Sequence, residues 1–98
     1  MNAKQPGVYI LASAPRGTLY IGVTAWLNRR TWEHQEGLVE GFTKRHEVKR
    51  LVWFELFSDF PAAIVREKQL KKWNRAWKIE LVEKTNPDWR DLSRELIA

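Results

Sequence analysis

Two short runs of β-branched and aromatic residues lie close together near the start of the chain, separated by Ala-Pro-Arg-Gly. The runs are Val8 to Ser13 and Thr18 to Val23, and Gly and Pro residues bound them. This arrangement is typical of a β-hairpin. If residues 14–17 form the loop, Ser13 pairs with Thr18, and the loop length sets the register of the whole hairpin.

That register predicts which side chains share a face. Tyr9 falls opposite Gly22, and because side chains alternate along a strand, Tyr9, Tyr20 and Gly22 lie on one side. The two phenols are then diagonal neighbours, and Gly22 leaves a gap in front of Tyr9. Either a small group of a substrate binds in this gap, or both rings pack into the core and Gly22 only accommodates a bend or a helix.

The rest of the chain predicts one further strand and several helices. We expect helices over Trp26 to about Leu38 with Thr24 as N-cap, over Pro61 to about Trp73 capped by Ser58 or Asp59, over Asn74 to Glu83 and from Asn86-Pro87 onward, and a strand over Arg50 to Phe57. This order favours an α/β domain around a small sheet. The 98 residues suffice for one modest core, so we expect residues 1–98 to form a single domain.

The helix that begins near Trp26 carries two polar side chains on its apolar face. By helical spacing, Arg30 and His34 lie on the same side as Trp26 and Leu27, whereas Arg29 pairs with Glu33 elsewhere. A guanidinium on such a face needs an anionic partner. This partner is a bound anion or a carboxylate of the protein, unless the stem of Arg30 merely covers apolar surface.

Glu67 raises the same question on a later helix. It lies inside an apolar arc that includes Ala63, Ile64, Leu70 and Trp73. A carboxylate on a buried face is costly unless it is paired or bound to a metal. The sequence leaves both alternatives open: an ion pair with Arg30, or a metal site.

Charge and composition narrow the classes of partner. Seventeen Lys and Arg against twelve Asp and Glu give a net charge of +5, which favours polyanions only weakly. The candidate phosphate contacts form two groups: Lys44 and Arg45, and then Lys68, Lys71, Lys72 and Arg75 with Trp73 and Trp77 interleaved. Alternatively, these lysines are a solvated surface and the tryptophans are core.

No cysteine is present, which excludes a disulfide or thiolate metal site. No segment approaches the roughly 20 apolar residues of a membrane span. We therefore expect a soluble, cytoplasmic protein.

Taken together, these residues resemble the GIY-YIG endonuclease superfamily. The matching parts are Gly7-Val8-Tyr9, Tyr20-Ile21-Gly22, Arg30, His34 and Glu67 within REKQLKKW, and the resemblance covers about residues 6–89. The chain is most similar to the small stand-alone bacterial branch, which is itself similar to the N-terminal domain of excinuclease C. It departs from the family pattern at Val8, where the name has Ile, and at Val23, where some relatives carry a lysine.

The resemblance implies a fold and an activity. The fold is a small three-stranded antiparallel sheet flanked by helices, and the activity is hydrolysis of a nucleic-acid phosphodiester with one Mg²⁺ or Mn²⁺ ion. Carried over by position, Glu67 holds the metal, Arg30 stabilises charge on the phosphate, and Tyr9 assists or acts as general base. Tyr20 and His34 position water, phosphate or the base.

The expected function is therefore that of a metal-dependent DNA endonuclease in repair or recombination. Branched, nicked or single-stranded DNA are the expected substrates, RNA is left open, and a protein partner is one way to supply target specificity. The alternative is a non-catalytic nucleic-acid-binding protein that retains the nuclease fold. A third interpretation is a protein-interaction domain with exposed tryptophans as anchors.

Overall fold

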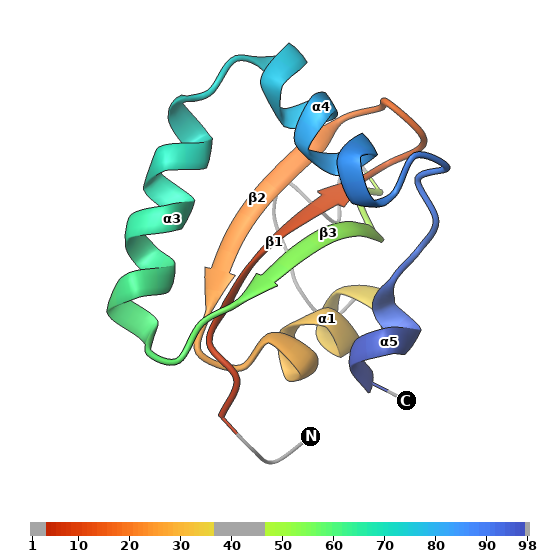
Figure 1. The fold of residues 1–98 in the computed structure, drawn as a ribbon. Coiled ribbons are helices and arrows are strands. Elements are labelled where there is room, and N and C mark those ends of the chain that lie inside the picture. Colours follow the sequence, from red (N-terminus) through yellow and green to blue (C-terminus); the bar gives the residue numbers. More distant parts are fainter. Residues whose placement is uncertain (1–3, 37–46, 98) are drawn as a thin grey trace.

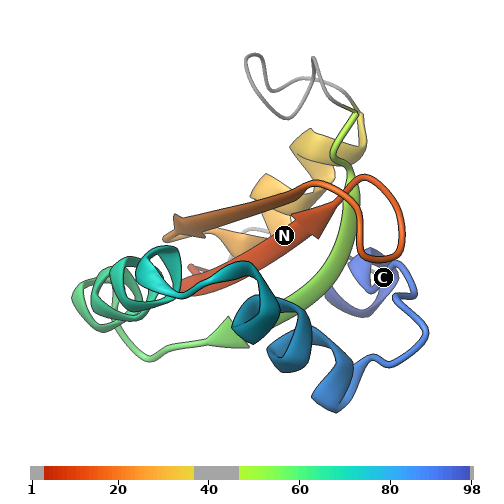
Figure 2. The same cartoon turned by 90° about the horizontal axis from the view of Figure 1, so that it is seen from above.

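The computed structural model describes residues 4–36 and 47–97, which form a three-stranded antiparallel sheet with helices on both faces (Figures 1 and 2). The elements are β1 (Gly7–Ala12), β2 (Leu19–Thr24), α1 (Leu27–Gln35), β3 (Arg50–Leu56), α3 (Phe60–Lys72), α4 (Arg75–Thr85) and α5 (Ser93–Ile97). This α+β architecture confirms the expected fold class.

The sheet has the order β2-β1-β3, so the first strand is central. Tyr9 pairs with Gly22 and Leu11 with Tyr20, as the loop length predicted. The loop closes where the Ser13 N–H donates to the Thr18 carbonyl at 3.0 Å. The predicted hairpin and its register are therefore confirmed.

Because β1 is central, both of its faces are buried, and each belongs to a separate apolar cluster. One cluster includes Val8 and Ile10 and lies against α3 and α4, whereas the other includes Tyr9 and Leu11 and lies against α1 and α5. Figure 2 shows α1 on the opposite side of the sheet from α3 and α4. The phenol of Tyr9 therefore points to the side of the sheet that α1 covers.

Helix α3 follows its sequence signals closely. The Asp59 carboxylate accepts a hydrogen bond from the N–H of Ala62 at 2.8 Å, and a proline occupies the first turn. Ala63 and Leu70 are fully buried, and Glu67 between them is only 9% exposed. The expected burial of Glu67 on the apolar face of this helix is confirmed.

Two expectations about helix starts were wrong. Thr24 does not cap α1: its Oγ1 accepts the N–H of Trp26 at 3.0 Å, and α1 begins at Leu27 without a side-chain cap. No helix starts at Asn86-Pro87 either. The amide of Asn86 instead donates to the carbonyls of Val52 and Arg90 and accepts the Arg90 N–H, and α5 begins only at Ser93.

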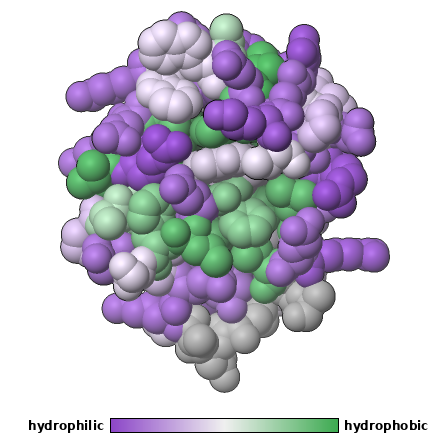
Figure 3. Space-filling model, viewed as in Figure 1, coloured by the Kyte–Doolittle hydropathy of each residue, from purple (hydrophilic) through white to green (hydrophobic). Residues whose placement is uncertain are grey.

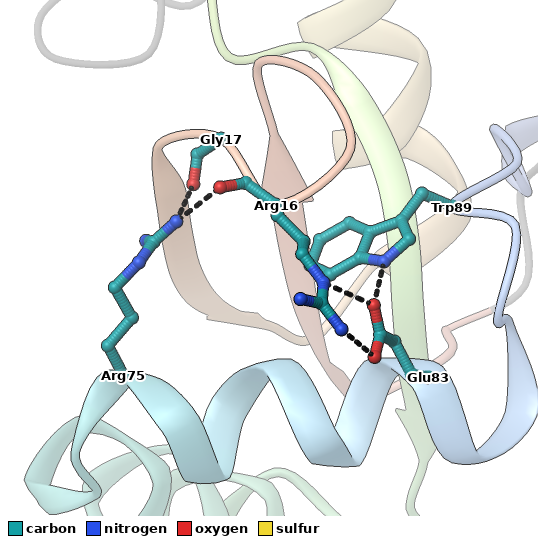
Figure 4. A network of polar contacts seen from close by, with 5 residues as sticks. All are labelled: Arg16, Gly17, Arg75, Glu83 and Trp89. Atoms are coloured by element: carbon teal, nitrogen blue, oxygen red, sulfur yellow. Dashed lines mark hydrogen bonds and ion pairs between the residues drawn. The ribbon is translucent and has the colours of Figure 1, made fainter.

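The tip of the hairpin is tied to α4 by a polar network (Figure 4). Arg16 donates two hydrogen bonds of 2.8 Å to Glu83, whose carboxylate also accepts the Trp89 indole N–H at 2.7 Å. Arg75 donates to the carbonyls of Arg16 and Gly17. Hydrogen bonds from Arg16 and then Trp89 lower the pKa of Glu83 to about 2. This network joins the hairpin loop to both ends of α4.

The surface framed by α3 and α4 is mixed in character. Figure 3 shows apolar residues gathered across the middle of this face, with hydrophilic residues around them. Within residues 4–36 and 47–97, no helix combines the length and apolar composition that a membrane span requires.

Candidate functional site

Tyr9, Tyr20 and His34 form an aromatic cluster on the α1 side of the sheet. The ring centroids of the two tyrosines are 6.4 Å apart, and the His34 centroid lies 5.9 Å from Tyr9 and 6.2 Å from Tyr20. The hairpin register brings the phenols together, and α1 places the imidazole over them. The structure thus brings together three residues that are widely separated in the sequence.

A polar contact joins two members of this cluster. The Tyr9 hydroxyl lies 3.4 Å from Nε2 of His34, and both side chains are about 4% exposed. This is a long hydrogen bond. When the imidazole proton is on Nδ1, Nε2 is the acceptor and the Tyr9 hydroxyl is the donor.

Gly22 is required by the position of the Tyr9 ring. A Cβ atom on Gly22 would overlap the hydroxyl end of that ring, with Cε1 only 2.9 Å away. The gap predicted in front of Tyr9 therefore holds the Tyr9 phenol itself. Gly22 lets the two strands keep their register while the phenol lies flat over the backbone.

The environment keeps both Tyr9 and His34 neutral near pH 7. Burial raises the pKa of Tyr9 well above its usual range, Tyr20 and Glu67 add to this, and Arg30 opposes it. Burial, followed by the nearby Arg30 charge, lowers the pKa of His34 to about 4. Both groups are therefore uncharged, and the phenol can donate a hydrogen bond to the neutral imidazole.

Arg30 reaches the site from α1 but keeps contact with solvent. Its side chain is 43% exposed, and its Nε lies 3.6 Å from a carboxylate oxygen of Glu33. Glu33 lies at the same distance from Arg29, so the predicted pair of Arg29 and Glu33 is confirmed. Leu27 and His34 on the same helix are buried, whereas Arg30 lies at the edge of the buried surface.

Glu67 is contributed by α3. Its negative charge raises the pKa of the Tyr9 phenol, although less than burial and Tyr20 do. Its partner is Lys71, with Nζ 2.9 Å from Oε2. No ion pair between Glu67 and Arg30 is present among the described residues, so that alternative for Glu67 was wrong.

The side chains of the described residues show which kind of metal ion Glu67 could bind. In residues 4–36 and 47–97 there is no group of three or more His, Cys, Asp or Glu side chains that could enclose an ion. A single carboxylate is nevertheless sufficient for Mg²⁺ that keeps water and takes substrate phosphate oxygens as its other ligands. The residues present therefore fit a hard cation shared with substrate, and they do not fit a closed structural site.

The expected phosphate contacts have different outcomes. Lys68, Lys71 and Lys72 are exposed on α3, although Lys71 is paired with Glu67. The guanidinium of Arg75 is engaged by the hairpin carbonyls. Lys44 and Arg45 lie outside the described residues.

The two interleaved tryptophans differ in exposure. Trp73 is half-buried and lies under the guanidinium of Arg66 at 5.5 Å, whereas Trp77 is 55% exposed. Their rings meet edge to face with centroids 5.9 Å apart. Trp73 is thus partly core, and Trp77 is a surface residue.

Sequence reasoning missed a cavity beside Arg30. It has a volume of about 250 Å³ and is lined by Thr24, Trp26, Arg29, Arg30 and Glu33. The signal that could have found it is the aromatic Trp26 directly before a helix whose first turn carries Arg29 and Arg30.

Comparisons of the sequence with known proteins point to one family. The family model described as the GIY-YIG catalytic domain matches residues 5–80. A UPF0213 protein from Syntrophus aciditrophicus is 37% identical over 82 residues, which cover 83% of this chain and 92% of that protein. UPF0213 proteins from Natronomonas pharaonis and Haloquadratum walsbyi are 39% and 36% identical, over 76% and 78% of this chain and 87% and 84% of their own.

No solved structure matches the chain significantly. The names of the three relatives describe no activity. The match to the catalytic domain nevertheless covers both tyrosine motifs, Arg30, His34 and Glu67. The chain therefore belongs to the GIY-YIG family of nuclease domains.

Proposed function

We propose that this protein is a metal-dependent endonuclease that hydrolyses DNA phosphodiester bonds. The observation that carries the proposal is the packing of Tyr9, Tyr20 and His34 against one another, with the Tyr9 hydroxyl 3.4 Å from Nε2 of His34. The charges of Arg30 and Glu67 both act on the Tyr9 phenol. Opposite charges beside a neutral proton-transfer pair are the parts that hydrolysis of a phosphate ester needs.

Arg30 binds the scissile phosphate in this proposal. Its partly exposed guanidinium is held only loosely by Glu33, at 3.6 Å, so a phosphate oxygen can replace the carboxylate. Planar guanidinium donors match the oxygens of a phosphate. Arg30 therefore stabilises the negative charge on the phosphate while the bond to the attacking water forms and the P–O bond to the sugar oxygen of the leaving strand breaks. That oxygen leaves with the electron pair and takes a proton from solvent.

Tyr9 and His34 move the proton of the attacking water. The Tyr9 oxygen accepts the water proton while its own proton passes to Nε2 of His34, 3.4 Å away. This relay avoids a buried phenolate, which the raised pKa of Tyr9 makes costly. A bound anionic phosphate raises the pKa of His34 from its low value and makes the imidazole a better acceptor. Tyr20, whose ring packs at a tilt against both of the other rings, restricts their orientation.

Glu67 would hold one Mg²⁺ or Mn²⁺ ion. When bound, the metal neutralises phosphate charge and makes the attacking water more acidic. The carboxylate has to exchange Lys71 for the ion, since Lys71 occupies Oε2 at 2.9 Å. The freed ammonium, together with Lys68 and Lys72, then contacts neighbouring phosphates.

The pair of Glu67 and Lys71 also favours a second candidate. A carboxylate neutralised by its own lysine needs no metal, which fits a non-catalytic nucleic-acid-binding protein with the same fold. In that case DNA binding is salt-sensitive and survives the loss of Glu67. In either role we propose action in the cytoplasm on branched, nicked or single-stranded DNA formed in repair or recombination, with a protein partner as one source of target choice.

The test is cleavage of a panel of labelled DNAs in Mg²⁺ and in Mn²⁺. The panel contains single strands, duplexes, flaps and four-way junctions, and Glu67→Gln and Arg30→Ala are purified alongside the wild type. Metal-dependent cleavage that both folded variants lose supports the nuclease. Absence of cleavage together with tight binding that Glu67→Gln retains would instead support the binding protein.

A further inference from the structure

We propose that the cavity beside Arg30 binds one nucleotide of an unpaired DNA strand, with its base stacked on Trp26 and its phosphate on Arg29. The proposal rests on the proposed function and names a residue that would make the site prefer single-stranded DNA. The volume of about 250 Å³ lies below the roughly 300–1,000 Å³ of sites for drug-sized ligands. It suits one base rather than a base pair.

Trp26 is held in place although its side chain is 37% exposed. Its N–H donates to Oγ1 of Thr24 at 3.0 Å, and its carbonyl accepts the N–H of Arg30 at 2.9 Å. The next residue, Leu27, is fully buried and donates its N–H to the Gln5 carbonyl at 2.9 Å. The backbone is thus fixed on both sides of an exposed indole, which is the preorganisation that a stacking surface needs.

The spacing of the cavity residues fits a nucleotide. Trp26, the residue before α1, and Arg30 on the first turn of α1 line the same cavity, and the Arg30 N–H donates to the Trp26 carbonyl at 2.9 Å. A nucleotide whose base lies on Trp26 therefore neighbours the phosphate that Arg30 binds. A base within a duplex is already stacked and paired, so only an unpaired base can use the indole.

The charges around the cavity favour a phosphate. Arg29 and Arg30 share one carboxylate, Glu33, and each contact is 3.6 Å long. These distances exceed the roughly 2.7–2.9 Å of a charge-assisted hydrogen bond. Two guanidinium groups against one carboxylate leave a net positive charge, and the Arg29 side chain is 66% exposed. The cavity thus combines an aromatic surface with a cationic edge.

The experiment measures binding without cleavage, in EDTA, to single-stranded DNA that contains the fluorescent base 2-aminopurine. The variants are Trp26→Leu, Trp26→Phe and Arg29→Ala, and the matched control is Trp32→Leu, since Trp32 lies on α1 and is 38% exposed. We expect Trp26→Leu to bind about 5- to 100-fold more weakly and to lose the fluorescence quenching, because one base–aromatic stack is lost. Trp26→Phe retains part of both effects, and Trp32→Leu behaves like the wild type.

Salt dependence separates the two contacts of the nucleotide. Arg29→Ala should reduce the slope of log affinity against log salt by about 0.7, the value for one phosphate contact on a single strand, whereas Trp26→Phe leaves the slope unchanged. Should Trp26→Leu fail to fold by circular dichroism, these two variants decide the matter. Duplex binding should be insensitive to Trp26→Phe.

The outcomes distinguish this inference from the proposed function. Unchanged affinity and quenching in the Trp26 variants overturn the stack, whatever the cleavage assays show. A loss of affinity in Trp32→Leu as large as that in Trp26→Leu also overturns it. Quenching by wild type without any cleavage in Mg²⁺ supports the stack and contradicts only the nuclease. Failure of the wild type to bind single strands overturns the stack, whereas the nuclease is contradicted only if no DNA of the panel is cleaved.

Discussion

His34 should make the protein less stable in mild acid. Its pKa falls from 6.5 to about 4 on folding, because burial and then the Arg30 charge disfavour the imidazolium, while Glu33 opposes the change in part. Between these two values the unfolded chain binds a proton that the folded protein does not bind. The folded state therefore loses stability as the pH drops from 6.5 toward 4, and the loss is complete below the lower value.

The size of this effect follows from the two pKa values. Each pH unit below the pKa of His34 in the unfolded chain lowers the free energy of unfolding by about 1.4 kcal/mol. The value of pH 5 lies about 1.5 units below that pKa. His34 is only 4% exposed, so solvent screening reduces this little. We expect the free energy of unfolding to fall by about 2 kcal/mol between about pH 7 and pH 5 on account of His34 alone.

The assay is urea unfolding at about pH 7, 6 and 5, followed by tryptophan fluorescence, for wild type and His34→Gln. Other groups also titrate in this range, so the informative quantity is the difference between the two pH profiles. Gln has no titrating side chain, and its profile should be flatter by about 2 kcal/mol at pH 5. Parallel profiles would refute the conclusion that His34 is buried in its neutral form.

Three further predictions concern individual contacts. Gly22→Ala should lower the cleavage rate at least about 100-fold in single-turnover assays and cost about 1–3 kcal/mol in urea unfolding, because the new Cβ displaces the Tyr9 phenol; wild-type rates would contradict the placement of that ring. Glu83→Gln should flatten the loss of stability that the wild type shows as pH falls from 4.5 to about 2, since the lowered pKa of Glu83 contributes stability above this window; an unchanged acid profile in unfolding experiments would argue against the network with Arg16. Lys71→Gln should lower the Mg²⁺ concentration for half-maximal cleavage at saturating DNA, because the ammonium no longer competes at Glu67; a higher Mg²⁺ requirement would show that the ion binds elsewhere.

Local signals in the sequence predicted the elements that local chemistry determines. The four-residue loop and the alternation of the strands gave the hairpin register, and with it the pairing of Tyr9 with Gly22. Asp59 and Pro61 predicted where α3 begins, and helical spacing predicted that Glu67 lies on the buried side of that helix. The proximity of Tyr9, Tyr20 and His34 is also what the roles carried over from the family resemblance imply.

The features that sequence reasoning missed depend on contacts between distant residues. Asn86 was expected to start a helix, but its amide bonds to the Val52 carbonyl, 34 residues away, and Trp89 then adopts a positive φ of 57°. Arg30 was one predicted partner of Glu67. The observed partner is Lys71, which lies one helical turn away on α3. Helical spacing does not show which of two cations a carboxylate selects, since that depends on how far apart the helices lie.

The sharpest test of the proposed site is the Mg²⁺-dependent, single-turnover cleavage rate of Glu67→Gln compared with Glu80→Gln. Both changes remove one negative charge from a helix, but Glu67 is buried on α3 and its charge raises the pKa of Tyr9, whereas Glu80 is exposed on α4. We predict that Glu67→Gln folds, binds DNA and loses cleavage by at least about 1,000-fold, whereas Glu80→Gln keeps the wild-type rate. Equal cleavage by the two variants would contradict the proposal that Glu67 completes a hydrolytic site with Tyr9, His34 and Arg30.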